Sequence, residues 1–311
     1  MSDTFFTAAP HWTWWIIFYF FIGGIAGAAF LLASLLHLFA QPTDRPLARL
    51  GYYVAFIGAV VSGLLLTLDL NRPLRFWHML IESNTGAPMF KSWVPMSVGS
   101  WGLLLFGLFA FLAALAALGE DRSDIKLLNS APVRLLRRRG PSAIIAVLGS
   151  IFGLFLAGYT GVLLAVSNRP IWADSTLLGL LFLVSAASTG AAALILLAHW
   201  RRAGHPESLA WLSWFDQRVL LAELLVLVVF LVSLGSVAQV FLSWWGLLLL
   251  IGVVGVGILW PLLLARQHRT HARRELIRGA SLVLIGGFLL RVVVLLSSEQ
   301  IHVIGSGVTT P

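Results

Sequence analysis

Long apolar stretches alternate with shorter polar segments along the whole of this chain. Eight such stretches are present, at residues 14–39, 52–70, 96–118, 143–166, 176–199, 219–238, 243–264 and 279–296. Each is near the roughly 20 residues that an α-helix needs to cross about 30 Å of hydrocarbon. The alternating pattern of a membrane β-strand is absent, and lipid requires every backbone polar group to be satisfied internally. The pattern therefore predicts an all-α membrane protein with eight transmembrane helices, the sixth and seventh joined by a tight hairpin at residues 239–242.

The composition agrees with a chain that is solvated by lipid. Of its 311 residues, 59% are hydrophobic and 11% are charged, and the mean hydropathy is +0.92, which is more than one soluble core could bury. We interpret residues 1–311 as a single integral membrane domain. The residues before position 14 lack the basic region of a signal peptide, so the first apolar stretch is predicted to be a span. Because the chain has no cysteine, it can form no disulfide and can hold no iron–sulfur cluster of its own through thiolates.

Basic residues are concentrated in every second connection. Sixteen of the 21 Lys and Arg residues follow the first, third, fifth and seventh stretches. They are Arg45, Arg49, Arg122, Lys126, Arg134, Arg137, Arg138, Arg139, Arg201, Arg202, Arg218, Arg266, Arg269, Arg273, Arg274 and Arg278. By the positive-inside rule this side is cytoplasmic, which places both termini outside a bacterial inner (cytoplasmic) membrane. The sequence pI of about 11.0 then reflects topology and contact with anionic lipid. Nucleic-acid binding is not expected, because the chain has no basic groove or aromatic reading module.

Three ionisable residues lie within the predicted spans. Such a residue costs about 2.5–3.5 kcal/mol on insertion scales, so each needs a partner or a water-filled cavity. Asp69 is near the outer end of the second span, Glu223 in the inner part of the sixth, and Arg291 in the outer half of the eighth. Asp69 has the alternative of solvation or an ion pair with an arginine of the following loop, and Glu223 that of reaching Arg218 or lipid head groups. For Arg291 we expect an acidic or carbonyl partner.

Two outer segments gather residue types that suit a quinol. The segment from Asp69 to His78 contains a carboxylate, two arginines and a histidine, and the segment from Tyr159 to Trp172 contains a phenol, an arginine and a tryptophan. A phenol, a carboxylate and an imidazole are groups that hydrogen-bond to a quinol head group and take up its protons. A structural role as a buried, hydrogen-bonded residue is the alternative for Tyr159.

The histidines do not favour haem, which inside a membrane needs facing pairs of histidines on neighbouring helices. His37 and His199 lie at inner span ends. The others lie in predicted loops or tails, at His11, His78, His205, His268, His271 and His302. Two other function classes stay open. One is a secondary transporter, although no inverted repeat is evident, and the other is a passive membrane anchor for a redox enzyme.

Five motifs in order along the chain resemble the NrfD/PsrC family of quinone-reactive membrane subunits. They run from the second predicted span to the eighth. They are Asp69-Leu-x-Arg72-Pro73-x-Arg75-Phe76-Trp77, the stretch from Pro88-Met to Gly99-Ser-Trp101, Tyr159-Thr-Gly161 with Pro170-x-Trp172, Trp245-Gly to Pro261, and Gly286-Gly-Phe-Leu-Leu-Arg291. Members of this family include the membrane subunits of polysulfide reductase and alternative complex III.

The resemblance implies two four-helix bundles without haem and a quinone pocket near the outer surface. It also implies an iron–sulfur electron-transfer subunit as partner, with a molybdopterin-type catalytic subunit beyond it. By this resemblance Tyr159 lies near the head group of menaquinone or ubiquinone. Further residues of the region are Asp69, Arg72, Arg75, Trp77 and His78.

The resemblance also concerns the first span and the polar residues of the second bundle. Polysulfide reductase has His and Asn near the quinone on its first span, where this chain offers Trp15 and Tyr19. Tyr19 is therefore the expected first-span contact. Glu223 and Arg291 resemble polar positions of the second bundle, for which a proton route has been suggested in some members.

Overall fold

The computed structural model describes residues 12, 14–70, 72–266, 272–298, 302–304 and 307–309. Its long helices are α1 (Trp14–Phe39), α2 (Arg45–Asp69), α3 (Pro95–Asp121), α5 (Arg139–Ala165), α6 (Leu178–Arg201), α7 (Pro206–Ser233) and α10 (Ala272–Ser297). A further continuous span consists of α8 (Trp244–Leu247), the π-helix η4 (Leu248–Leu259) and α9 (Trp260–Arg266). Within the described residues, seven helices are long and apolar enough to cross a membrane, and the number is eight if α7 and η3, which meet at a bend, are counted as one span. The predicted helical, multi-span fold is confirmed.

Short elements connect these helices. They are the 3₁₀-helices η1 (Pro42–Asp44), η2 (Pro73–Met79) and η3 (Gly235–Leu242), the helix α4 (Ala131–Leu136), and the antiparallel strands β1 (His302–Ile304) and β2 (Gly307–Thr309). Several residues of the sequence analysis lie outside the described part of the chain. They are Arg269, His11, His268 and His271, together with the side chains of Arg266, Arg273 and His302.

Several helices extend beyond the apolar stretches from which they were predicted. α2 begins at Arg45 and not at residue 52, α7 begins at Pro206 and not at residue 219, and α10 begins at Ala272 and not at residue 279. Hydropathy marks only the part of a helix that lipid covers, whereas Arg, Glu and Gln continue a helix readily in water. Arg218, predicted in a connection, therefore lies within α7, with its guanidinium carbon 5.1 Å from the ring centroid of Trp214.

The tight hairpin predicted between the sixth and seventh spans is wrong. α7 already ends at Ser233, and η3 turns away from it by 111°. Gly235 adopts φ +55 directly after the helix, a left-handed conformation that commonly ends helices and that glycine adopts at little cost. Because η3 is as apolar as the spans around it, hydropathy alone could not separate it from the sixth span.

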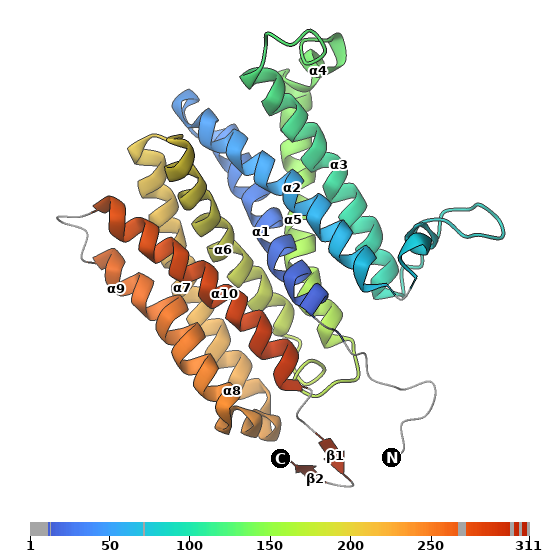
Figure 1. Ribbon diagram of the computed structural model, residues 1–311, viewed down its shortest axis with the longest axis vertical. Coiled ribbons are helices and arrows are strands. Elements are labelled where there is room, and N and C mark those ends of the chain that lie inside the picture. Colours follow the sequence, from blue (N-terminus) through green and yellow to red (C-terminus); the bar gives the residue numbers. More distant parts are fainter. Residues whose placement is uncertain are drawn as a thin grey trace.

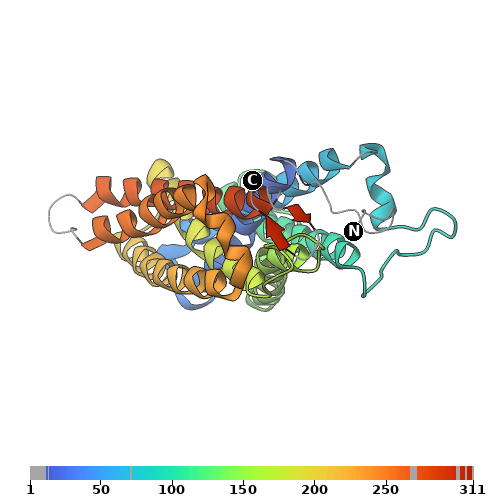
Figure 2. The ribbon, with the colours of Figure 1, turned by 90° about the horizontal axis from the view of Figure 1, so that it is seen from below.

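The long helices form two rings of contacts that lie side by side (Figures 1 and 2). In the first ring, α1 and α3 each pack on both α2 and α5. In the second ring, α6 packs on α7 and α10, and η4 contacts both α7 and α10. Contacts of α6 with α1 and α5 join the rings. Helix backbones approach each other closely in the second ring. A Cβ on Gly257 of η4 would lie 2.5 Å from the Cα of Gly286 in α10, as expected of small residues at membrane helix interfaces.

The two ends of the molecule differ. Residues 72–94, between α2 and α3, project sideways as an arm (Figure 1), and we call this end of the rings the arm end. α1 and α3 begin there, and α2, α5 and α10 end there. The opposite end carries α4 and the turn between α6 and α7 (Figure 1). We call it the basic end, because the arginine-rich connections of the chain lie there.

Candidate functional site

Tyr159 lies on the last turns of α5, at the arm end of the first ring. Its hydroxyl donates a hydrogen bond to the main-chain oxygen of Pro95, the first residue of α3, at 2.6 Å. Its ring stacks on Phe155, with the centroids 5.2 Å apart, and fills the space that a Cβ on Gly99 would need. Because the hydroxyl proton is committed to a carbonyl, the phenol oxygen is left to accept a hydrogen bond from a second partner.

A second phenol, Tyr19 of α1, is buried in the same region. Its helix packs on α5, which carries Tyr159. The ring of Tyr19 and the Oγ of Ser62 border the same space beside Gly23. The Ser62 oxygen is buried and has no hydrogen-bond partner among the described residues. Buried polar groups are normally satisfied, so this orphaned hydroxyl beside the Tyr19 ring fits a site that receives a polar group of a ligand. Sequence reasoning did not find Ser62, because one serine in an apolar span carries no signal.

The arm places His78 next to the ring but outside it. Nδ1 of His78 lies 3.0 Å from the main-chain oxygen of Arg75, and the imidazole stacks on Trp77, with the centroids 3.8 Å apart. A carbonyl can only accept, so Nδ1 carries the proton, and in the neutral ring Nε2 is free to take one up. The arm is tied to α3, because the main-chain oxygen of Met89 accepts a hydrogen bond from Nε1 of Trp101 at 2.9 Å.

The other residues predicted for this site differ in how far they are exposed to solvent. Asp69 is the last residue of α2 and is half-buried, so it lies where the ring meets the arm. Arg72, Arg75 and Trp77 are exposed. The structure thus places Tyr19 and Tyr159 inside the ring on two helices that pack together, and it leaves the arginines of the arm on the surface.

The turn between α5 and α6 contains a conformation that sequence reasoning missed. Ile171 adopts φ +70 while fully buried, which is a genuine outlier for a β-branched residue. Next to it, Nε1 of Trp172 donates to the main-chain oxygen of Val294 in α10 at 2.8 Å, and the buried Arg169 lies over the Trp172 ring at 5.4 Å. A backbone conformation of this kind persists only where surrounding contacts hold it in place. Here the contacts of Trp172 connect the turn after α5 to α10 at the arm end.

A buried polar cluster lies in the second ring. Nη1 of Arg291 donates to the main-chain oxygen of Gly287 at 2.6 Å and to Oγ of Ser185 at 3.0 Å, and its Nε lies 3.4 Å from the main-chain oxygen of Phe20 in α1. The carbonyl partner expected for Arg291 is therefore confirmed. Ser188 donates to Glu223 at 2.9 Å, and its hydroxyl also lies 3.0 Å from the main-chain oxygen of Ser185. The two serines thus lie between the acid and the guanidinium.

Glu223 is buried inside the second ring. Its side chain is 3% exposed and accepts the hydrogen bond of Ser188, which argues against the alternative of a contact with head groups. Asp216, two turns earlier on α7, is also buried and interacts electrostatically with Glu223. Its Oδ1 has no hydrogen-bond partner among the described residues. Asp216 was missed because the sixth span was predicted to start after it.

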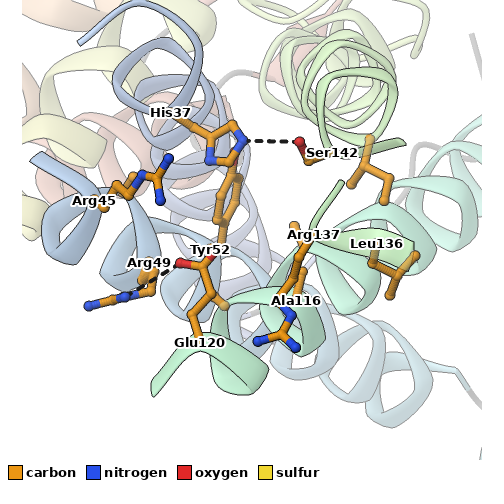
Figure 3. A pocket seen from close by; sticks show the side chains of 13 residues that line it. His37, Arg45, Arg49, Tyr52, Ala116, Glu120, Leu136, Arg137 and Ser142 are labelled. Carbon is orange, nitrogen blue, oxygen red and sulfur yellow. Dashed lines mark hydrogen bonds and ion pairs between the residues drawn. The ribbon is translucent and has the colours of Figure 1, made fainter. Parts of the chain in front are cut away.

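A polar cavity at the basic end of the first ring is shown in Figure 3. Nε2 of His37 lies 3.4 Å from Oγ of Ser142, and Arg49 pairs with Glu120 at 3.4 Å. Its volume of about 30 Å³ has room for one or two water molecules, since one needs roughly 10–15 Å³. A quinone ring does not fit there. In the described part of the chain, no group of three or more His, Cys, Asp or Glu side chains is placed to hold a metal ion.

Comparison with known proteins identifies relatives over nearly the full chain. The family model for polysulphide reductase, NrfD, matches residues 4–303. Protein NrfD of Escherichia coli is 29% identical, with 93% of this chain and 95% of that protein aligned. The C component of the polysulfide reductase of Wolinella succinogenes is 28% identical, with 93% and 94% aligned. The C component of the selenate reductase of Mesobacillus selenatarsenatis is 26% identical over 106 residues, 34% of this chain and 22% of that protein. The resemblance inferred from the motifs is confirmed.

Proposed function

The chain belongs to the NrfD/polysulfide reductase family, and from that premise we propose that it is the quinone-reactive membrane subunit of a respiratory oxidoreductase complex. The observation that carries this proposal is the buried polar lining at the arm end of the first ring. There the orphaned Ser62 hydroxyl lies beside Tyr19, and the oxygen of Tyr159 still has a lone pair to offer. Two relatives are named as components of polysulfide and selenate reductases, which supports a role in a reductase complex. The two rings then correspond to the two four-helix bundles of the family.

The arm end faces the outside of a bacterial inner membrane in this proposal. The positive-inside rule supports the orientation, because the arginine-rich connections lie at the other end. An iron–sulfur subunit docks on the outer side and exchanges electrons with the site, and a molybdopterin-type catalytic subunit lies beyond it. The absence of cysteine from the chain means that any cluster belongs to the partner.

When bound, a quinol supplies two electrons and two protons, and the redox chemistry is its own. The oxygen of Tyr159 accepts a hydrogen bond from a head-group hydroxyl, and Tyr19 and Ser62 provide polar contacts on the other side. Nε2 of His78, or the carboxylate of Asp69, takes up the two protons one after the other and passes each to water. Trp77 holds the imidazole by stacking, and Arg72 or Arg75 holds the Asp69 carboxylate in position.

The cluster in the second ring is proposed to move protons. It extends from Asp216 through Glu223 and the two serines to Arg291. Arg291 in turn contacts the main-chain oxygen of Phe20, the residue that follows Tyr19 on α1. Buried ionisable groups in membrane helices are typical of proton relays. The cluster therefore gives a chain of polar groups that reaches the neighbourhood of the quinone site.

Binding of a quinone analogue to the purified complex tests the proposal. A short-chain menaquinone or ubiquinone analogue with a fluorescent or spin label should bind to the wild-type complex, and Ser62→Leu, which replaces the orphaned hydroxyl with a bulky apolar group, should reduce binding. A passive anchor would bind no analogue in either form. A secondary transporter would instead take up solute in vesicles that contain this chain without partner subunits.

A further inference from the structure

A large cavity at the basic end of the second ring lies outside the proposed redox site. It is formed where the ends of α6, α7 and α10 meet, and its volume is about 580 Å³. Cavities of roughly 300–1,000 Å³ are typical of small-molecule sites. Its apolar lining includes the buried Ile195 of α6 and the half-buried Leu209 of α7 and Leu276 of α10. The mouth is lined by His199, Trp200 and Arg202.

Arg202 occupies a backbone position at which a side chain is unusual. It follows the last residue of α6 with φ 52 and ψ 33, and the amide of Ala203 donates to the main-chain oxygen of Ala198 at 2.9 Å. This is a left-handed helix end, where glycine is the common residue because it lacks a Cβ. The chain has a glycine two positions later, at Gly204. An arginine at the disfavoured position indicates that its side chain is needed, and that side chain lines the cavity.

The charge at the mouth is positive. Among the described residues, none that lines the cavity is a carboxylate, and Arg202 forms no ion pair with any of them. Arg201, the preceding residue, is exposed but does not line the cavity. Trp200 is 84% exposed at the end of a membrane helix, a position where tryptophan anchors helices at the level of lipid head groups. A ligand for this cavity therefore has an anionic head and an apolar tail.

We propose that the cavity binds one anionic phospholipid, such as phosphatidylglycerol or cardiolipin. The guanidinium of Arg202 donates to the oxygens of the phosphodiester, with His199 at the same mouth, because arginine recognises phosphate with charge-assisted, often bidentate hydrogen bonds. The acyl chains lie along Leu209 and Leu276. Basic pockets between membrane helices are recognised sites for such head groups. The bound lipid would hold α10 against the α6–α7 turn.

The test uses the full-length protein, with any partner subunits that accompany it, in mild detergent. Dioleoyl phosphatidylglycerol, dioleoyl phosphatidylcholine and inorganic phosphate are added separately, and retained lipid is measured by native mass spectrometry and the unfolding midpoint by thermal scanning. Phosphatidylglycerol should be retained and should raise the midpoint, whereas phosphatidylcholine and phosphate should not. Arg202→Gly should weaken retention about fivefold, because a basic residue near anionic lipid contributes about 1 kcal/mol. Without lipid its midpoint should be unchanged or higher, because glycine suits the left-handed position.

Two further variants make the result decisive. Arg201→Gln removes the neighbouring charge, which does not line the cavity, and should keep retention near the wild-type value. Leu276→Trp fills the apolar wall from another helix and should expel the lipid if Arg202→Gly proves too unstable to study. Equal retention by the wild type, Arg202→Gly and Leu276→Trp would overturn the proposal. Protection by inorganic phosphate as large as that by phosphatidylglycerol would overturn the assignment to a lipid.

Discussion

Replacing Tyr159 by Phe separates a structural role of this phenol from a role in quinol binding. The change removes one hydroxyl, whose visible partner is the main-chain oxygen of Pro95 at 2.6 Å. The ring keeps its stacking on Phe155 and its place over Gly99. A hydrogen bond contributes a net 0.5–1.5 kcal/mol, about 0.6 kcal/mol on average inside membranes. The variant should therefore assemble normally and lose little stability.

The effect on turnover should be larger than the effect on stability. If the phenol oxygen accepts a hydrogen bond from the quinol, its loss removes that bond and the orientation that it imposes. A loss of about 1.4 kcal/mol in the quinol-bound state corresponds to a roughly tenfold decrease in kcat/KM. The assay is quinol-linked electron transfer in the purified complex, with the amount of assembled complex measured in the same preparation.

Tyr52→Phe is the matched control. Tyr52 is another buried phenol of the first ring, but it lies toward the basic end, 3.4 Å from the hydroxyl of Ser34. The same chemical change there should leave turnover unaltered. A loss for Tyr159→Phe of less than about twofold, below the value of one hydrogen bond, would refute the reasoning. Equal losses for the two variants would show a general effect on the ring and refute it as well.

Three further predictions follow from the geometry. His78→Asn keeps a donor for the Arg75 carbonyl but removes Nε2, and it should slow quinol oxidation about 100-fold if His78 is the proton acceptor. Asp69→Asn in the same steady-state assay shows whether the carboxylate has that role instead. Normal rates in both variants would exclude these two residues as proton acceptors. Glu223→Gln retains a hydrogen-bond acceptor for Ser188 but removes the charge, so proton movement measured with a pH-sensitive dye in proteoliposomes should fall more than electron transfer does, and a normal proton-to-electron ratio would contradict the proposed route. Gly257→Ala places a Cβ 2.5 Å from the Cα of Gly286 and should cost about 1–3 kcal/mol, seen as a lower unfolding midpoint, whereas Gly63→Ala, which has no such neighbour, should not lower it.

The spans could be predicted from the sequence, whereas the ends of several helices could not. Seven or eight spans could be predicted because the free energy of placing a residue in lipid is a local property, which a window of about 20 residues records. The ends of α2, α7 and α10 could not, because helices continue past the hydrocarbon as long as the residues tolerate helical backbone. The error at α7 mattered most, since it hid Asp216, and no feature of the sequence indicated that Glu223 is buried against Ser188.

The sequence by itself determined the helical membrane fold, the segregation of arginines to one end and the family, through motifs that combine Arg72, Tyr159 and Arg291. Tertiary structure alone decided which polar groups meet. Pro95 and Tyr159 are 64 positions apart, and Phe20 and Arg291 are 271 apart, so their contacts depend on how each helix is rotated about its axis and on closure of the rings. Rotation is set by packing of small residues against neighbouring helices, a property of pairs of helices that no single stretch of sequence contains.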